Sequence, residues 1–183
     1  KPDYPEAHSN LGNTLQELGR LDESISCYVC AISLEAHFDS AYFNLGLALE
    51  NASFHKADQS LYPILINLLT RGNFVRPNSV ARAISSLLKL DKLIEDVLTN
   101  TTVSPDIKEV DRAIKTLDQV QLLHQLMRIC PLPDLQLEAS FVSMRRVLLA
   151  GHGKTEARTE VIHFLSTLSL HCFTNEYIYF ESE

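Results

Sequence analysis

Residues 5–38 read PEAHSNLGNTLQELGRLDESISCYVCAISLEAHF, and the stretch that follows, DSAYFNLGLALE (39–50), repeats part of this text. The tripeptide Asn-Leu-Gly occurs at 10–12 and again at 44–46, so the two copies lie 34 residues apart. Self-similarity at a fixed period of this size is typical of proteins built from stacked helical units. The repeated stretch therefore decides the fold class that we expect for the N-terminal part of the chain.

Within the first copy, apolar residues recur at helical spacing. One stripe predicts a first helix, formed by Ala7, Leu11, Leu15 and Leu18. After Gly19-Arg20 a second stripe predicts another helix, formed by Leu21, Ile25, Tyr28, Ile32 and Leu34. Neither helix can bury its stripe alone, so we expect a helical hairpin. Leu11, Leu15, Ile25 and Tyr28 are expected to form its packed seam.

This hairpin resembles the tetratricopeptide repeat (TPR) family. The resemblance rests on Leu11-Gly12, Leu15, Gly19, Leu21, Ile25, Tyr28, Ala31 and Leu34, with Ser24 in place of the family's alanine and with departures at His8 and Ala36. It implies two repeats, at 5–38 and 39–72, arranged as a right-handed α-solenoid. In the second repeat the turn at 51–54 is one residue short and Pro63 interrupts the expected second helix, so we expect this repeat to be degenerate.

In TPR proteins the first helix of each hairpin lines a concave face that binds protein or peptide ligands. The resemblance therefore implies a peptide groove lined by Glu6, Ser9, Asn10, Asn13, Gln16, Glu17, Ser40, Phe43, Asn44 and Leu47. Asn10 and Asn44 stand at equivalent positions, and an amide can both donate to and accept from an extended peptide backbone. The alternative is that these residues form an ordinary solvated helix face. None of these residues is basic, so none could pair with the terminal carboxylate of a peptide.

Beyond residue 72 the repeat register is lost, but apolar residues still recur every three or four positions. Breaks are predicted near residues 76, 100–105 and 130–134, with Ser104 as a natural N-cap before Pro105 and one long helix over 107–127. No segment alternates at period two over more than a few residues. We therefore expect an all-α fold of nine or ten helices, in which residues 73–183 form a helical bundle that extends the solenoid.

The part of the chain at 122–180 is similar to a helical segment found in bacterial proteins between a TPR array and a class I methyltransferase domain. The similarity rests on three runs, at 130–138, 144–149 and 172–177. It implies an alternative function. The chain would be the substrate-recruiting or regulatory region of an S-adenosylmethionine-dependent methyltransferase, whose catalytic domain lies in cis beyond residue 183.

Three patterns invite a chemical interpretation, and none completes its motif. Gly153-Lys154-Thr155 ends like a phosphate-binding loop, but Leu148 stands where that loop needs glycine. Cys27 and Cys30 have the spacing of half a zinc site without a second ligand pair. The seven histidines are scattered without ligand or triad spacing. We therefore expect no catalytic residue, cofactor or metal in this chain, and interpret it as not an enzyme by itself.

Composition restricts the partners further. Lys and Arg number 16 against 23 Asp and Glu, giving a net charge of −7, the opposite of a phosphate-binding surface. No apolar run is long enough for a membrane span, and four irregularly spaced cysteines with no leader sequence suggest the cytoplasm. We thus expect no nucleic acid and no membrane as partners. The sequence predicts a non-catalytic protein-interaction or scaffolding module belonging to a larger protein.

Overall fold

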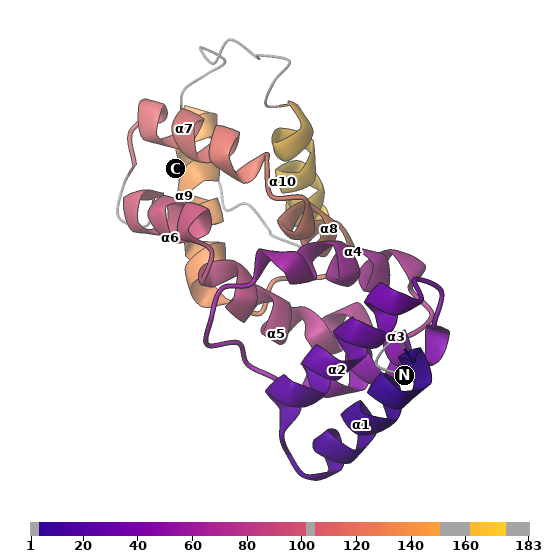
Figure 1. The fold of residues 1–183 in the computed structure, drawn as a ribbon. Coiled ribbons are helices and arrows are strands. Elements are labelled where there is room, and N and C mark those ends of the chain that lie inside the picture. Colours follow the sequence, from indigo (N-terminus) through magenta and orange to yellow (C-terminus); the bar gives the residue numbers. More distant parts are fainter. Residues whose placement is uncertain (1–3, 102–104, 151–161, 175–183) are drawn as a thin grey trace. The chain divides into compact units, whose positions relative to one another are not determined.

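The computed structural model describes residues 4–101, 105–150 and 162–174. These residues form ten α-helices and one 3₁₀ turn, with no strand among them (Figure 1), so the expected all-α fold is confirmed. The helices are α1 (Pro5–Glu17), α2 (Leu21–Leu34), α3 (Asp39–Glu50), η1 (Gln59–Leu61), α4 (Tyr62–Arg71), α5 (Pro77–Lys89), α6 (Lys92–Thr101), α7 (Ile107–Leu117), α8 (Gln121–Ile129), α9 (Leu135–Ala150) and α10 (Ile162–Thr174). Of the described helices, none combines the length and the apolar character that crossing a membrane requires.

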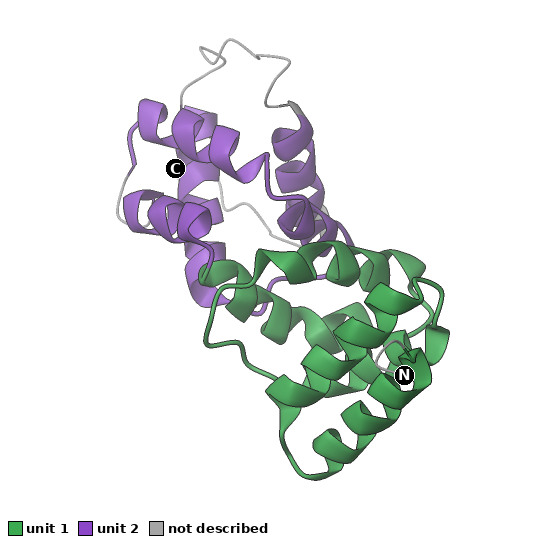
Figure 2. Cartoon of the chain, in the orientation of Figure 1, with its two compact units in different colours: residues 1–90 green, residues 91–183 purple. Residues whose placement is uncertain are grey.

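The chain divides into two compact units, Lys1–Leu90 and Asp91–Glu183 (Figure 2). The first unit therefore includes α5 and extends past residue 72, where the sequence places the end of the second repeat. It opens with the hairpin of α1 and α2, which pack closely against each other. Gly19 forms the turn with a φ of 74°, a left-handed conformation that glycine adopts without strain. The Ser24 hydroxyl donates to the carbonyl of Gly12 at 2.8 Å and links the two helices.

The buried face of α1 is made of two small residues and one leucine. Ser9, Gly12 and Leu15 are buried, whereas Leu11 is 51% exposed. The expected seam role of Leu11 is therefore wrong, although Leu15, Ile25 and Tyr28 are buried as expected. The cause is Gly12, where an added Cβ would lie 2.6 Å from Cε1 of Tyr28. Because Gly12 has no side chain, the Tyr28 ring reaches the α1 backbone and fixes the rotation of the helix.

The second repeat departs from the hairpin plan. Helix α3 packs against α1, α2 and α5, and the chain then runs through residues 51–58 without a helix. Pro63 does not interrupt the next helix, as the sequence suggests, but lies in the first turn of α4. Proline is tolerated there because the amides of a first turn have no partner within the helix. Gly72 follows the last residue of α4 as its C-cap and has a φ of 62°.

Arg71, the last residue of α4, ties the end of that helix to the start of α3. Its guanidinium lies over the Tyr42 ring, 4.6 Å from the ring centroid, and Phe74 stacks on the same ring. It also donates to the Asp39 carboxylate at 3.1 Å and to the carbonyl of Ala36 at 3.2 Å. The Arg71 side chain is 28% exposed and that of Asp39 is 69% exposed, whereas Tyr42 is buried, so the contact with the ring is shielded from water more than the ion pair is.

Replacing Arg71 by alanine is therefore expected to lower the free energy of unfolding by about 1–3 kcal/mol, because a cation–π contact and charge-assisted hydrogen bonds are lost together. Urea denaturation at constant m-value measures the loss. Arg20→Ala is the matched control, since Arg20 pairs with Glu23 on the surface at side-chain exposures of 55% and 56%. The urea midpoint of Arg20→Ala should lie close to that of the wild type. Equal midpoints for the two variants would contradict this role of Arg71.

The second unit divides the long helix expected over 107–127 into α7 and α8. A turn at Asp118-Gln119-Val120 separates them, so the prediction of one continuous helix is wrong there. The cap of α7 is Asp106, not Ser104, which lies outside the described residues. Asp106 accepts from the Glu109 amide at 2.8 Å and Glu109 bonds back to the Asp106 amide, which completes a capping box.

Helices α6 and α7 pack on each other and on α9, while α10 packs on α8. Between α9 and α10, Phe141 makes edge contacts with Phe164 and His171. The buried His171 ring also lies 3.1 Å from the Glu138 carboxylate. The second unit thus holds a core in which buried histidines from α8 and α10 take part.

Candidate functional site

The outer face of α1 and α3 carries a chain of hydrogen-bonded amides. Asn44 on α3 donates through Nδ2 to Oδ1 of Asn13 on α1 at 2.9 Å. The Tyr28 hydroxyl from α2 lies 2.8 Å from the same Asn13 oxygen and 2.9 Å from the Gln16 amide. Both partners are amide oxygens, and a phenol has one proton to give, so the two oxygens share the Tyr28 hydroxyl as their donor. The polar chain therefore joins three helices of the first unit.

Nine of the ten residues expected to line the peptide groove reach the surface. Six are exposed (Asn10, Asn13, Glu17, Ser40, Phe43 and Leu47) and three are half-buried (Glu6, Gln16 and Asn44). Ser9 is the correction, because only 4% of it is exposed and it lies on the buried face of α1. It stands one turn before Gly12 and shares the face that packs in the core. A ligand on the outer face cannot reach it.

Two apolar side chains stand beside the amides. Phe43 is 48% exposed and Leu47 is 39% exposed. They are four residues apart on α3, so they occupy the same side of the helix. We call the surface made of Asn13, Phe43, Asn44 and Leu47 the α1–α3 face. It combines apolar anchors with oriented amides, a combination that suits a peptide better than a small charged ligand.

The cysteine pattern singled out by the sequence shows ordinary free thiols. Cys27 is half-buried and Cys30 exposed on α2, and no described cysteine forms a disulfide. Burial raises the pKa of the Cys130 thiol to about 11, which makes it a poor nucleophile at neutral pH. Gly151-His152-Gly153-Lys154-Thr155 and the final aromatic residues Tyr177, Tyr179 and Phe180 lie outside the described residues.

Two of the surface hollows among the described residues include no residue of the α1–α3 face in their lining. One, in the second unit, lies between α6 and α7 and is lined by both charged and apolar side chains, among them Asp96, Glu109, Arg112 and Val97. The other, in the first unit, is lined by the α1–α2 turn and by residues that follow α3. The hollow of the first unit carries both Ser53 and His55, and no hydrogen bond joins these two side chains.

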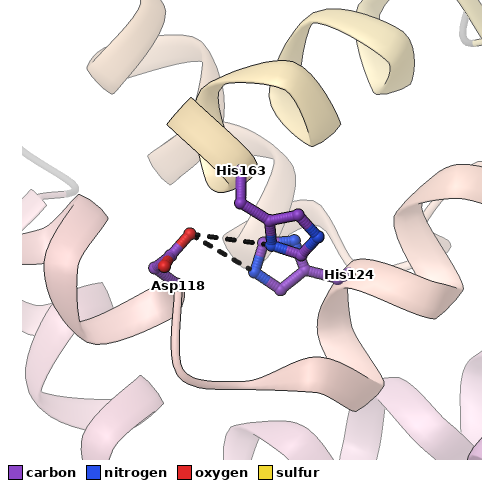
Figure 3. Close-up of side chains that lie close together, drawn as sticks. All are labelled: Asp118, His124 and His163. Atoms are coloured by element: carbon purple, nitrogen blue, oxygen red, sulfur yellow. Dashed lines mark ion pairs between the residues drawn. The ribbon is translucent and has the colours of Figure 1, made fainter. Parts of the chain in front are cut away.

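Sequence reasoning missed one side-chain cluster in the second unit. Asp118 in the α7–α8 turn, His124 on α8 and His163 at the start of α10 meet at a single point, as Figure 3 shows. The Asp118 Oδ1 atom lies 4.0 Å from His124 Nε2 and 3.7 Å from His163 Nδ1. The two imidazole rings are tilted, with centroids 4.2 Å apart. No local spacing signals this cluster, because α10 comes from a distant part of the chain and meets α8 only in the fold.

The three residues of the cluster differ in their exposure to solvent. His124 is buried, whereas the His163 side chain is 61% exposed and that of Asp118 is 24% exposed. Burial lowers the pKa of His124, and His163 nearby lowers it further, while Asp118 and two backbone carbonyls act in the opposite direction. His124 is therefore a neutral imidazole at pH 7, held in a cluster that opens to solvent on one side.

Comparison with known families gives one match. A family model described as TPR repeat matches residues 12–52, which span the second half of α1, all of α2 and all of α3. This confirms the TPR resemblance for that segment and indicates a protein-interaction module with protein partners in general. No curated protein and no solved structure matches the chain significantly. The similarity of residues 122–180 to a methyltransferase-linked segment gains no support from these comparisons.

Proposed function

We propose that this chain is a non-catalytic scaffold that binds an extended peptide across the α1–α3 face. The observation that carries the proposal is the amide chain from Asn44 through Asn13 to the buried Tyr28 hydroxyl. The TPR repeat at 12–52 supports it, because the matched segment holds all of the α1–α3 face.

The hydrogen-bond inventory of the two asparagines explains how a backbone would be recognised. The Asn13 oxygen faces two donors, Asn44 Nδ2 and the Tyr28 hydroxyl, so what it offers a ligand is its NH₂ group. Asn44 uses one N–H on Asn13, and its carbonyl oxygen accepts no bond from a described residue. The pair thus presents a donor and an acceptor side by side, which matches the C=O and N–H groups of an extended peptide.

The amides are also oriented in advance. The Tyr28 side chain is completely buried and its hydroxyl fixes the direction of the Asn13 amide. A ligand that meets an ordered donor and acceptor avoids part of the entropy cost of binding. Phe43 and Leu47 then supply apolar contact area beside the polar pair.

The negative charge of the chain restricts which peptides can bind to the α1–α3 face. Glu6 and Glu17, the charged residues of the predicted groove set, are both acidic, and the chain carries a net charge of −7. An acidic peptide would be repelled, so the proposed ligand is neutral or basic, with at least one apolar side chain for Phe43 and Leu47.

The proposal predicts the effect of removing Asn44. Peptides selected from a displayed random library on the full chain should bind with micromolar affinity, and Asn44→Ala and Phe43→Ala should each weaken binding at least about tenfold. Ser33→Ala is the control, because Ser33 is exposed on α2 and bonds only within its own helix. Fluorescence anisotropy of labelled peptides gives the dissociation constants. Equal affinities for Asn44→Ala and Ser33→Ala would show that the peptides bind elsewhere and would overturn the proposal.

A further inference from the structure

The Thr167 hydroxyl occupies one ring nitrogen of His124. It donates its proton to the carbonyl of His163 at 3.1 Å, and its oxygen lies 2.9 Å from His124 Nδ1. With the Thr167 proton on the His163 carbonyl, Nδ1 is the nitrogen that carries the hydrogen, and the other nitrogen of a neutral imidazole is then an acceptor. In this tautomer His124 directs the Nε2 lone pair into the cluster with Asp118 and His163.

This lone pair is buried and lacks a partner. The His124 side chain is 4% exposed, and its Nε2 atom makes no hydrogen bond among the described residues. It faces Oδ1 of Asp118 at 4.0 Å, so two electron-rich atoms confront each other. A buried acceptor aimed at a carboxylate is unfavourable unless a positive charge lies between them.

We propose that Asp118, His124 and His163 form a binding site for a divalent transition-metal ion, and that Zn²⁺ is the ion that suits it best. Imidazole nitrogen and carboxylate oxygen are ordinary zinc ligands, whereas Mg²⁺ and Ca²⁺ select oxygen ligands. The three ligand atoms already lie within 4.8 Å of one another. Tetrahedral zinc, with bonds of about 2.0–2.2 Å, places its ligand atoms roughly 3.3–3.6 Å apart. The distances of 4.0 and 3.7 Å from Asp118 to the two histidines therefore have to shorten by a few tenths of an ångström.

Two of the proposed ligands, His124 and Asp118, are held by contacts within the fold, whereas the third, His163, can adjust. His124 is held by Thr167, and Asp118 accepts the amide of Phe164 at 2.9 Å while it faces the histidines. Such outer contacts orient metal ligands in proteins. His163 is 61% exposed, so its ring can turn toward the ion without disturbing the core. With three protein ligands, the solvent side leaves a fourth position for water or for an outside ligand.

Zinc binding to the full chain tests the proposal, with calorimetry for affinity and thermal melting for linked stability. The wild type should bind one ion at this site and melt at a higher temperature with Zn²⁺ but not with Mg²⁺. His163→Ala should weaken zinc binding at least about tenfold and keep the fold, because the side chain it removes is mostly exposed. His55→Ala is the matched control, since it removes an exposed histidine of the other unit, and it should bind like the wild type.

Two further variants separate the ligand roles from general stability. Asp118→Asn keeps an oxygen for the Phe164 amide but removes the charge, and Thr167→Val removes the contact that orients His124. Each should weaken zinc binding by about 10- to 100-fold. Cobalt then identifies the type of ligand, because the absorption spectrum of bound Co²⁺ shows a thiolate charge-transfer band only if a cysteine binds the ion, and the chain has four free cysteines. That band in the wild type, or an unchanged zinc affinity in His163→Ala, would overturn the proposal.

Discussion

Replacing Tyr28 by alanine is expected to lower the free energy of unfolding by about 3–5 kcal/mol, the range for truncating a large buried aromatic side chain. None of Tyr28 is exposed, and its ring fills the space above Gly12. The substitution leaves a cavity between α1 and α2 and also removes the hydroxyl that holds Asn13 and Gln16. Chemical denaturation followed by far-ultraviolet circular dichroism measures the change.

Leu11→Ala provides the contrast for this measurement. Leu11 is 51% exposed, so its removal should cost less than about 1 kcal/mol, although the sequence alone assigns it to the same seam as Tyr28. Tyr28→Phe adds a milder variant, in which the ring is kept and only the hydrogen bonds are lost, at a cost of about 1–2 kcal/mol. If Leu11→Ala were as destabilising as Tyr28→Ala, the rotation of α1 described above would be wrong.

Gly12→Ala is expected to destabilise the first unit by about 1–3 kcal/mol, because an added methyl group overpacks the contact with Tyr28. Its Cβ would lie 2.6 Å from Cε1 and 2.9 Å from Cδ1 and Cζ of a ring that is completely buried and cannot withdraw. This clash outweighs the gain of up to about 1 kcal/mol that alanine brings over glycine inside a helix.

The control for Gly12→Ala is the equivalent glycine of the second copy. At Gly46 an added Cβ would lie 3.1 Å from Cβ of Val75, a half-buried residue outside any helix, which can move by a few tenths of an ångström. Gly46→Ala should therefore be close to neutral, as the gain in helix propensity offsets a mild contact. The melting temperatures of both variants measure these effects. If both substitutions changed the melting temperature equally, the Tyr28 ring would be able to move away from the added Cβ.

The hairpin of α1 and α2 could be predicted because its evidence is local. A repeated Asn-Leu-Gly and two apolar stripes at helical spacing fix the helices and the turn at Gly19. Which face of α1 is buried could not be predicted in the same way. Apolar periodicity favours Leu11, whereas the packing depends on the absence of a side chain at Gly12, and a missing side chain does not register in a hydrophobic pattern.

The ends of helices also cannot be predicted from apolar periodicity alone. The apolar stripe from Ile107 to Met127 continues through Asp118, so periodicity alone predicts one helix where the structure has two. Pro63 suggests an interruption, but its effect depends on where the helix begins, and at the first turn of α4 it does no harm. Both differences follow from capping and turn geometry, which determine where a helix ends.

For the α1–α3 face, the sequence predicted the residues but not the contacts between them. Asn13 and Asn44 follow from the repeat register, yet their bond to each other and to Tyr28 depends on how three helices pack. Asp118, His124 and His163 leave no trace in sequence spacing, since α10 has to fold onto α8 before they meet. Long-range contacts of this kind are what a single sequence conceals.

The connection between α3 and α4 has a consequence for how the first unit can be altered. Its first part is anchored, because Ala52 is buried and the Phe54 amide donates to the Ser86 hydroxyl at 3.2 Å. The next residues, His55, Lys56 and Ala57, are exposed and belong to no helix. Extra residues placed after Lys56 leave the core contacts on both sides intact. This point is therefore the natural place in the first unit to graft a reporter domain or to open the chain for circular permutation.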